Sequence, residues 1–125
     1  MARTVLVADD NPGFAELVRA TLEEAGYEVV TASTGLAAVA AMQNHAVGLA
    51  VLDVLMPGIS GDAVAERLLQ LDASLPVLLM TGSDSSFAVG SGLPVLRKPF
   101  PPEELVAAVR RLVPPPTEES GDEVD

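Results

Sequence analysis

Residues 51–61 read VLDVLMPGISG, and this stretch organises the rest of the chain. It begins as an apolar strand and ends in a turn, because Pro57 and Gly58 are typical turn residues. A single acid, Asp53, stands where the strand becomes the turn. Charged side chains are rarely buried without partners, so an acid at this place needs a reason. A cap or turn role is the ordinary explanation, but Pro57, Gly58 and Ser60 already supply those signals. We therefore interpret Asp53 as a reactive centre.

The composition indicates one domain with an aliphatic core. The chain has 125 residues, of which 49% are hydrophobic and 3% aromatic,. A formal net charge of −11 argues against binding to nucleic acid or to anionic membranes, since both need a basic surface,. The absence of cysteine excludes disulfides, thiolate nucleophiles and cysteine-ligated metals,. We see no signal peptide and no apolar run near the ~20 residues of a membrane span, and we expect a cytoplasmic protein.

Apolar runs and helical patterns alternate along the chain. We expect strands at residues 4–8, 28–32, 49–52, 77–80 and 93–97,. We expect helices at about residues 14–25, 35–43, 60 or 61 to 71, and 102–113,. Apolar strands that each precede a helix predict a parallel sheet covered on both faces. The predicted fold class is α/β, a doubly wound five-stranded parallel sheet with strand order 2-1-3-4-5.

Three details of this architecture are less regular. In the second helix we expect Leu36, Val39 and Ala40 to face inward. Residues 82–92 are rich in Ser and Gly, so we expect the fourth helix to be shortened or absent. The domain is expected to span residues 1–113, and residues 114–125 to form a Pro-rich, then acidic, disordered tail,.

The conspicuous polar residues fall at the carboxyl ends of the predicted strands. Asp9 and Asp10 follow the first strand, Asp53 ends the third, Thr81 ends the fourth, and Lys98 ends the fifth. Open α/β sheets bind ligands outside these ends, where the strand order reverses. In the order 2-1-3-4-5 the first and third strands are neighbours, so the three carboxylates are expected to share one pocket. Lys98 is the only lysine in the sequence.

Three neighbouring carboxylates repel one another unless a cation is present. Mg²⁺ prefers oxygen ligands and commonly takes one or two carboxylates, waters and substrate phosphate. With the metal bound, an anionic phosphoryl group can approach, and a carboxylate can act as a nucleophile that forms an acyl phosphate. The Thr81 hydroxyl and the Lys98 ammonium are placed to stabilise the phosphoryl oxygens. The residues therefore predict a magnesium-dependent phosphoryl site.

Four motifs in this order resemble the receiver (response-regulator) family of two-component signalling. They are residues 5–10 (VLVADD), 53–61 (DVLMPGISG), 79–82 (LMTG) and 96–100 (LRKPF). The similarity extends over about residues 4–113 and implies the flavodoxin-like receiver fold. It implies that a histidine kinase, or a histidine phosphotransfer protein, passes a phosphoryl group to Asp53.

The resemblance also implies roles for the remaining site residues. Thr81 and Lys98 would contact the phosphoryl oxygens, and the Lys98–Pro99 peptide bond would be cis, which only a bond to proline tolerates at low cost. The implied cofactor is Mg²⁺. Its implied ligands are Asp9, Asp10, Asp53 and the backbone carbonyl of Leu55.

The chain departs from the family pattern at three places. Val95 stands three residues before Lys98, where receivers usually carry the aromatic that turns inward on switching. The 17 positions from Thr81 to Lys98 are fewer than is usual, which resembles some receivers attached to hybrid histidine kinases. Leu55 is apolar where many relatives are polar, so we expect slow attack of water on a phosphorylated Asp53.

We expect a regulatory phosphoacceptor, with at most slow self-dephosphorylation, that signals through a partner protein as a monomer or weak dimer. One alternative is a phosphorylation-independent protein-binding module on the same fold. Another is a Mg²⁺-dependent aspartyl phosphatase, although such enzymes usually separate their two acids by one residue, whereas Asp9 and Asp10 are adjacent. A flavin site is disfavoured because acids replace a phosphate-binding loop. We expect His45 to be a solvated loop residue.

Overall fold

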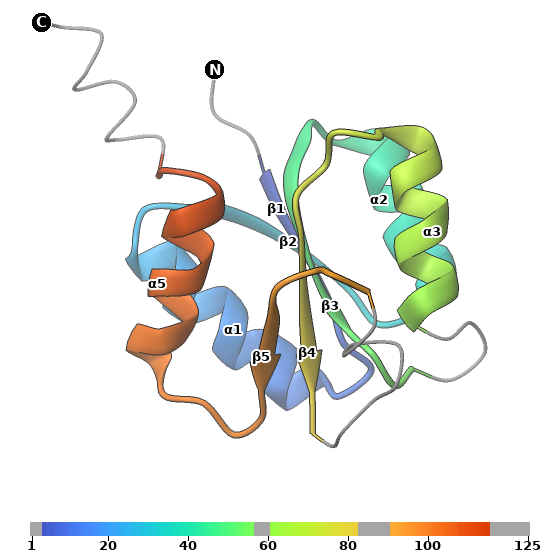
Figure 1. Ribbon diagram of the computed structural model, residues 1–125. Helices are drawn as coiled ribbons and strands as arrows, with labels where there is room; N and C mark the ends of the chain where they lie inside the picture. The colour runs from blue at the N-terminus through green and yellow to red at the C-terminus, as the bar shows by residue number, and fades with distance from the viewer. Residues whose placement is uncertain (1–3, 57–60, 83–90, 116–125) are drawn as a thin grey trace, which may run out of the picture.

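The computed structural model describes residues 4–56, 61–82 and 91–115, which form three layers, helices on a sheet on helices (Figure 1). The strands are β1 (Thr4–Ala8), β2 (Glu28–Ala32), β3 (Val47–Asp53), β4 (Val77–Thr81) and β5 (Val95–Arg97). The helices are α1 (Pro12–Glu24), α2 (Gly35–Asn44), α3 (Gly61–Leu71) and α5 (Pro102–Leu112). All strand pairs are parallel and the order is β2-β1-β3-β4-β5, which confirms the predicted doubly wound sheet.

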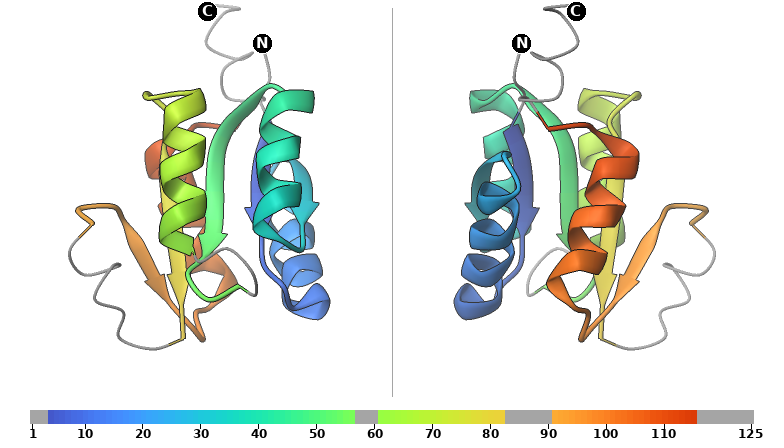
Figure 2. Two further views of the ribbon diagram at one scale, coloured as in Figure 1. Left: turned by 90° about the vertical axis from the view of Figure 1, so that its right-hand side faces the viewer. Right: turned by 90° about the vertical axis from the view of Figure 1, so that its left-hand side faces the viewer.

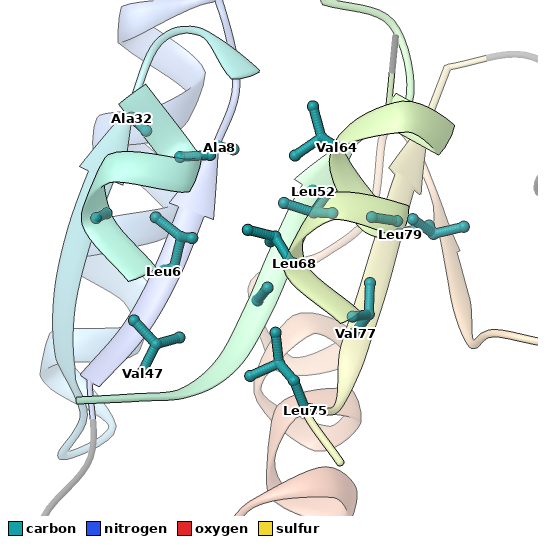
Figure 3. Packing of buried hydrophobic residues seen from close by; sticks show 14 of the residues in the cluster. Leu6, Ala8, Ala32, Val47, Leu52, Val64, Leu68, Leu75, Val77 and Leu79 are labelled. Carbon is teal, nitrogen blue, oxygen red and sulfur yellow. The ribbon is translucent and has the colours of Figure 1, made fainter. Parts of the chain in front are cut away.

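Alternate residues of each strand enter opposite layers of core. Helices α1 and α5 cover one face of the sheet, and α2 and α3 cover the other (Figure 2). Along β1, Val5 and Val7 pack in the cluster under α1 and α5, whereas Leu6 and Ala8 pack in the cluster under α2 and α3 (Figure 3). Successive strand side chains point to opposite faces, so an entirely apolar strand is what a sheet covered on both sides requires.

The hydrogen-bond ladder continues one residue past three strand ends. This extension fixes the first residue of the loops at the carboxyl edge of the sheet. The bonds run from Asp9 N to the Ala32 carbonyl (3.0 Å), from Val54 N to the Met80 carbonyl (2.9 Å), and from Lys98 N to the Thr81 carbonyl (2.8 Å). The backbone that carries the polar residues is therefore held by the sheet itself.

Local signals set the helix boundaries. Asn11 caps α1 by accepting a hydrogen bond from Phe14 N (3.1 Å), and Pro12 occupies the first turn, where its missing N–H costs nothing,. Gly26 follows α1 with φ of 103°, a conformation that side chains with a Cβ rarely adopt,. Thr34 caps α2 through its hydroxyl. Val113 follows α5, and its carbonyl accepts a hydrogen bond from the Tyr27 hydroxyl (2.6 Å).

The structure corrects the expected inner face of α2. Leu36 is 70% exposed and Ala40 is exposed, whereas Ala38 and Ala41 are buried against the sheet; Val39 is only partly buried. Alanine and other apolar residues surround this helix on all sides, so hydrophobic periodicity could not identify the buried face.

Strand lengths differ slightly from expectation. β3 is longer than predicted, because it starts at Val47 and includes Asp53, while β5 is only three residues long. No helix lies between β4 and β5 in the residues described there, 82 and 91–94. The predicted turn at 57–60, most of the Ser/Gly-rich segment (83–90) and most of the tail (116–125) lie outside the described residues. Within the described part of the chain, every helix is too short or too polar to cross a membrane.

Candidate functional site

Three carboxylates from two adjacent strands meet at the carboxyl edge of the sheet. Asp9 and Asp10 follow β1, Asp53 ends β3, and each offers one oxygen that lies within 4.8 Å of the other two. Asp9 is 1% exposed and Asp53 is 6% exposed, whereas Asp10 is exposed. The predicted convergence of the three acids is confirmed, and it follows from the β1–β3 pairing at the point where the strand order reverses,.

Lys98, the residue after β5, adds a positive charge at the same place. Its Nζ lies 2.9 Å from Asp9 Oδ2 and 3.5 Å from Asp53 Oδ2. The other carboxylate oxygens accept backbone hydrogen bonds, Asp9 Oδ1 from Asn11 N (2.9 Å) and Asp53 Oδ1 from Leu55 N (3.3 Å). Backbone donors thus orient both acids so that one oxygen of each faces the ammonium. The Lys98–Pro99 peptide bond is cis, as the resemblance implies.

The environment of Asp53 disfavours its negative charge. Burial raises the pKa of the Asp53 carboxyl above its ordinary value, and the neighbouring charge of Asp9 raises it further,. The Lys98 ammonium and the Leu55 N–H oppose this rise in pKa but do not cancel it. A cation beside the carboxylates would favour the ionised, nucleophilic form. Carboxylate oxygens at these spacings are the hard ligands that Mg²⁺ takes, so the donor set fits that metal,.

Two further predicted residues lie at this edge. Thr81 is the last residue of β4 and is 4% exposed. Leu55 follows β3 and is 67% exposed, so its side chain lies at the surface beside Asp53.

Val95 begins β5, pairs with Leu79 and is 39% exposed. The position where an aromatic is usual is thus occupied by a half-exposed aliphatic side chain.

An aromatic pair lies beside the lysine and was not predicted from the sequence. The Lys98 Nζ lies 4.3 Å from the centroid of the Phe14 ring. Phe100 meets that ring edge-on, with centroids 5.7 Å apart and an interplanar angle of 76°. The helical pattern at residues 14–25 includes Phe14 but gives no sign of a contact with Lys98. The place of Phe14 in the first turn, four residues after Asp10, was the available signal that it lies near the acids.

The comparisons with known proteins agree with this geometry. The sequence model of one protein family, the response regulator receiver domain, matches residues 5–110. The chain belongs to the response regulator receiver domain family. Receivers are regulatory phosphoacceptors of two-component systems, and Mg²⁺ bound at acidic residues is typical of them.

Curated relatives and solved structures place this receiver among response regulators. It is 34% identical over 118 residues to the alkaline phosphatase synthesis transcriptional regulatory protein PhoP of Bacillus subtilis (90% of this chain, 49% of PhoP). It is 37% identical over 115 residues to the probable transcriptional regulatory protein TcrX of Mycobacterium tuberculosis (88% of this chain, 49% of TcrX). The receiver therefore spans about half the length of these relatives.

Two solved structures share the fold closely. The chemotaxis protein CheY4 of Vibrio cholerae superposes with a TM-score of 0.84 at 30% identity, covering 90% of this chain and 100% of that one. The response regulator TrrA of Thermotoga maritima, solved in complex with Mg(2+)-BeF, gives a TM-score of 0.79 at 32% identity (89% and 99% covered). The association with hybrid histidine kinases stays a prediction.

Proposed function

We propose that Asp53 of this receiver accepts a phosphoryl group from a histidine kinase or a histidine phosphotransfer protein. The observation that carries the proposal is the cluster itself: Asp53, Asp9 and Asp10 within 4.8 Å, with Lys98 in contact with two of them. An Asp53 oxygen attacks the phosphorus of phosphohistidine. The new P–O bond forms an acyl phosphate as the P–N bond breaks, and the histidine nitrogen leaves with the electron pair.

Asp9, Asp10, Asp53 and the Leu55 backbone carbonyl are the proposed ligands of Mg²⁺. When bound, the metal supplies positive charge that lets an anionic phosphoryl group approach the acids. Asp9 and Asp53 already have one oxygen each fixed by a backbone N–H, so the chain presents its ligands in defined orientations. In this proposal the Lys98 ammonium and the Thr81 hydroxyl stabilise the phosphoryl oxygens from the β4–β5 side.

The deciding experiment replaces Asp53 by Asn. We expect the unaltered chain, treated with acetyl phosphate and Mg²⁺, to gain one phosphoryl group by intact mass, and Asp53→Asn to gain none. Glu66→Gln is the matched control, because it removes an exposed carboxylate of α3 away from the site. Stoichiometric labelling of Asp53→Asn would remove Asp53 from the proposed role. Omitting Mg²⁺ or adding a chelator is expected to abolish labelling of the unaltered chain.

The output of this receiver is proposed to be a protein partner in the cytoplasm. A net charge of −11 supports a protein rather than a nucleic acid as the direct target,. The half-exposed Val95 favours a second candidate, a binding module that works independently of phosphorylation. Partner affinity measured with and without the phosphoryl group separates the two, since a switch must bind its two states differently.

A further inference from the structure

Lys98 lies between two carboxylates and an aromatic ring. The carboxylates of Asp9 and Asp53 contact the ammonium at 2.9 and 3.5 Å, and the Phe14 ring centroid lies 4.3 Å away. An ammonium over a ring face is attracted by the ring quadrupole, and the attraction grows when the ammonium is desolvated. The Lys98 side chain is only 22% exposed, so water competes weakly for it.

The Phe14 ring is itself held in place. Phe14 occupies the first turn of α1, where its backbone N–H is bonded to the Asn11 cap, and it packs on the buried cluster under α1 and α5. Phe100, two residues after Lys98, packs on the same cluster and meets the Phe14 ring edge-on. An edge-to-face pair is a favourable aromatic arrangement. The ring face over Lys98 is therefore a fixed surface.

A divalent cation bound by the three acids changes what Lys98 contacts. Such a cation takes carboxylate oxygens, so it competes with the ammonium for Asp9 and Asp53. Two positive charges in one pocket also repel each other. The ring keeps its attraction for the ammonium throughout, because it binds no metal and carries no charge.

We infer that Phe14 is a positioning residue for Lys98, whose ring holds the ammonium at the site when a metal competes for the carboxylates. This inference rests on the proposed function, in which Lys98 stabilises the phosphoryl group. Phe14 thus orients the Lys98 side chain, as backbone N–H groups orient the carboxylates of Asp9 and Asp53.

The first test is spectroscopic and independent of phosphorylation. Because Lys98 is the only lysine, protein labelled with ¹³C-lysine gives a single Cε–Hε cross-peak. We expect the ring current of Phe14 to shift the Hε signal upfield from that of free lysine, with and without Mg²⁺. Phe14→Leu, which keeps an apolar side chain but lacks a ring, is expected to lose the shift. Phe14→Tyr is expected to restore it.

The second test is the rate of phosphorylation by acetyl phosphate at saturating Mg²⁺. We expect Phe14→Leu to lower the rate constant ~5-fold and Phe14→Tyr to change it less than ~2-fold. Leu17→Ala is the control, since Leu17 lies on the same helix and is 56% exposed. Thermal unfolding of each variant is recorded, because a merely structural role for Phe14 would lower Tm without moving the lysine signal.

Each outcome decides the inference. A lysine signal without a ring-current shift, or one that Phe14→Leu leaves unchanged, overturns it. A shift that is lost in Phe14→Leu together with an unaltered phosphorylation rate also overturns it. If the unaltered chain takes up no phosphoryl group, the proposed function fails, and the Mg²⁺ titration still tests the inference. Release of the shifted signal by Mg²⁺ then rejects it, and retention supports it.

Discussion

As the proposed phosphoacceptor, Asp53 combines two requirements that oppose each other: it must be buried enough to exclude water and charged enough to attack phosphorus. Burial and the charge of Asp9 raise its pKa, and Lys98 only partly offsets them. The folded chain without metal therefore binds a proton at Asp53 more tightly than the unfolded chain does. By linkage, the free energy of unfolding falls as pH rises from the ordinary value of 3.8 through the folded-state pKa, and stays lowered at neutral pH,.

Removing this charge is expected to stabilise the fold. In metal-free buffer at pH 7, Asp53→Asn should have a higher Tm than the unaltered chain. The difference should shrink below pH 3.8, where Asp53 is protonated in both states,. Thermal unfolding across pH with a chelator measures it, and Glu66→Gln controls for the loss of an exposed acid. A lower Tm for Asp53→Asn at pH 7 would show that the ion pair with Lys98 outweighs the cost of burial.

Leu55 is expected to set the lifetime of the phosphoryl group. Its side chain is 67% exposed beside Asp53 and has no polar group to orient an attacking water. We expect Leu55→Asn to speed the loss of the phosphoryl group once the donor is removed, since an amide can hydrogen-bond that water. Time-resolved intact mass follows the decay. Leu36→Asn is the matched control, because Leu36 is 70% exposed on α2; equal lifetimes for Leu55→Asn and the unaltered chain would contradict the prediction.

At the scale of residues, the sequence predicted which strand end each site residue occupies better than it predicted the contacts between their side chains. Asp9, Asp10, Asp53 and Lys98 all lie where strand ends were expected, because parallel strands bring their carboxyl ends to one edge. The ring of Phe14 over Lys98 was not predicted. That contact joins residues far apart in the chain, and no local pattern encodes which face of a first-turn aromatic meets a distant side chain.

At the scale of elements, Gly61 controls how β3 connects to α3. Its N–H donates to the Val54 carbonyl (2.9 Å). A Cβ at this position would lie 2.6 Å from Val54 Cα and 2.9 Å from the Asp53 carbonyl oxygen, both of them backbone atoms. The helix can start here only because the residue has no side chain. The end of β3, and Asp53 with it, is therefore packed directly against the first residue of α3.

Gly61→Ala is expected to lower the free energy of unfolding by roughly 2–3 kcal/mol, since backbone must move to admit the methyl group. The same movement shifts Asp53, so Mg²⁺ affinity should fall as well. Chemical denaturation and calorimetry measure the two effects. Gly82→Ala is the control: its Cβ would meet nothing within 4 Å, and its effect should stay within about 0.5 kcal/mol,. Equal stability of the two variants would refute the steric argument.

The elements themselves were largely predictable. Apolar runs located all five strands, and the first helix, expected at about residues 14–25, is observed at Pro12–Glu24. The inner face of α2 was not predictable from Leu36, because that side chain is exposed in the first turn while small alanines fill the contact with the sheet.

At the scale of the whole molecule, the net charge and the cluster of Asp9, Asp10 and Asp53 would both attract the proposed Mg²⁺ ion. A net charge of −11 attracts divalent cations over long distances, and salt screens this attraction, with a Debye length of ~10 Å at 0.1 M and ~3 Å at 1 M,. We expect the Mg²⁺ dissociation constant to rise several-fold between low and high NaCl by calorimetry. A Glu103→Gln, Glu104→Gln variant, altered at exposed positions on α5, should show a weaker dependence on salt. A dissociation constant independent of NaCl would assign affinity to the local cluster alone.

The shortness of β5 has a consequence for recognition. As a sheet-edge strand of three residues, it offers only a few peptide groups to which an incoming extended segment could add as a sixth strand,. Main-chain augmentation is therefore a poor docking mode on that side. On that side, a partner of the kind proposed above would discriminate through side chains, and edge-to-edge pairing of copies through β5 is correspondingly disfavoured,.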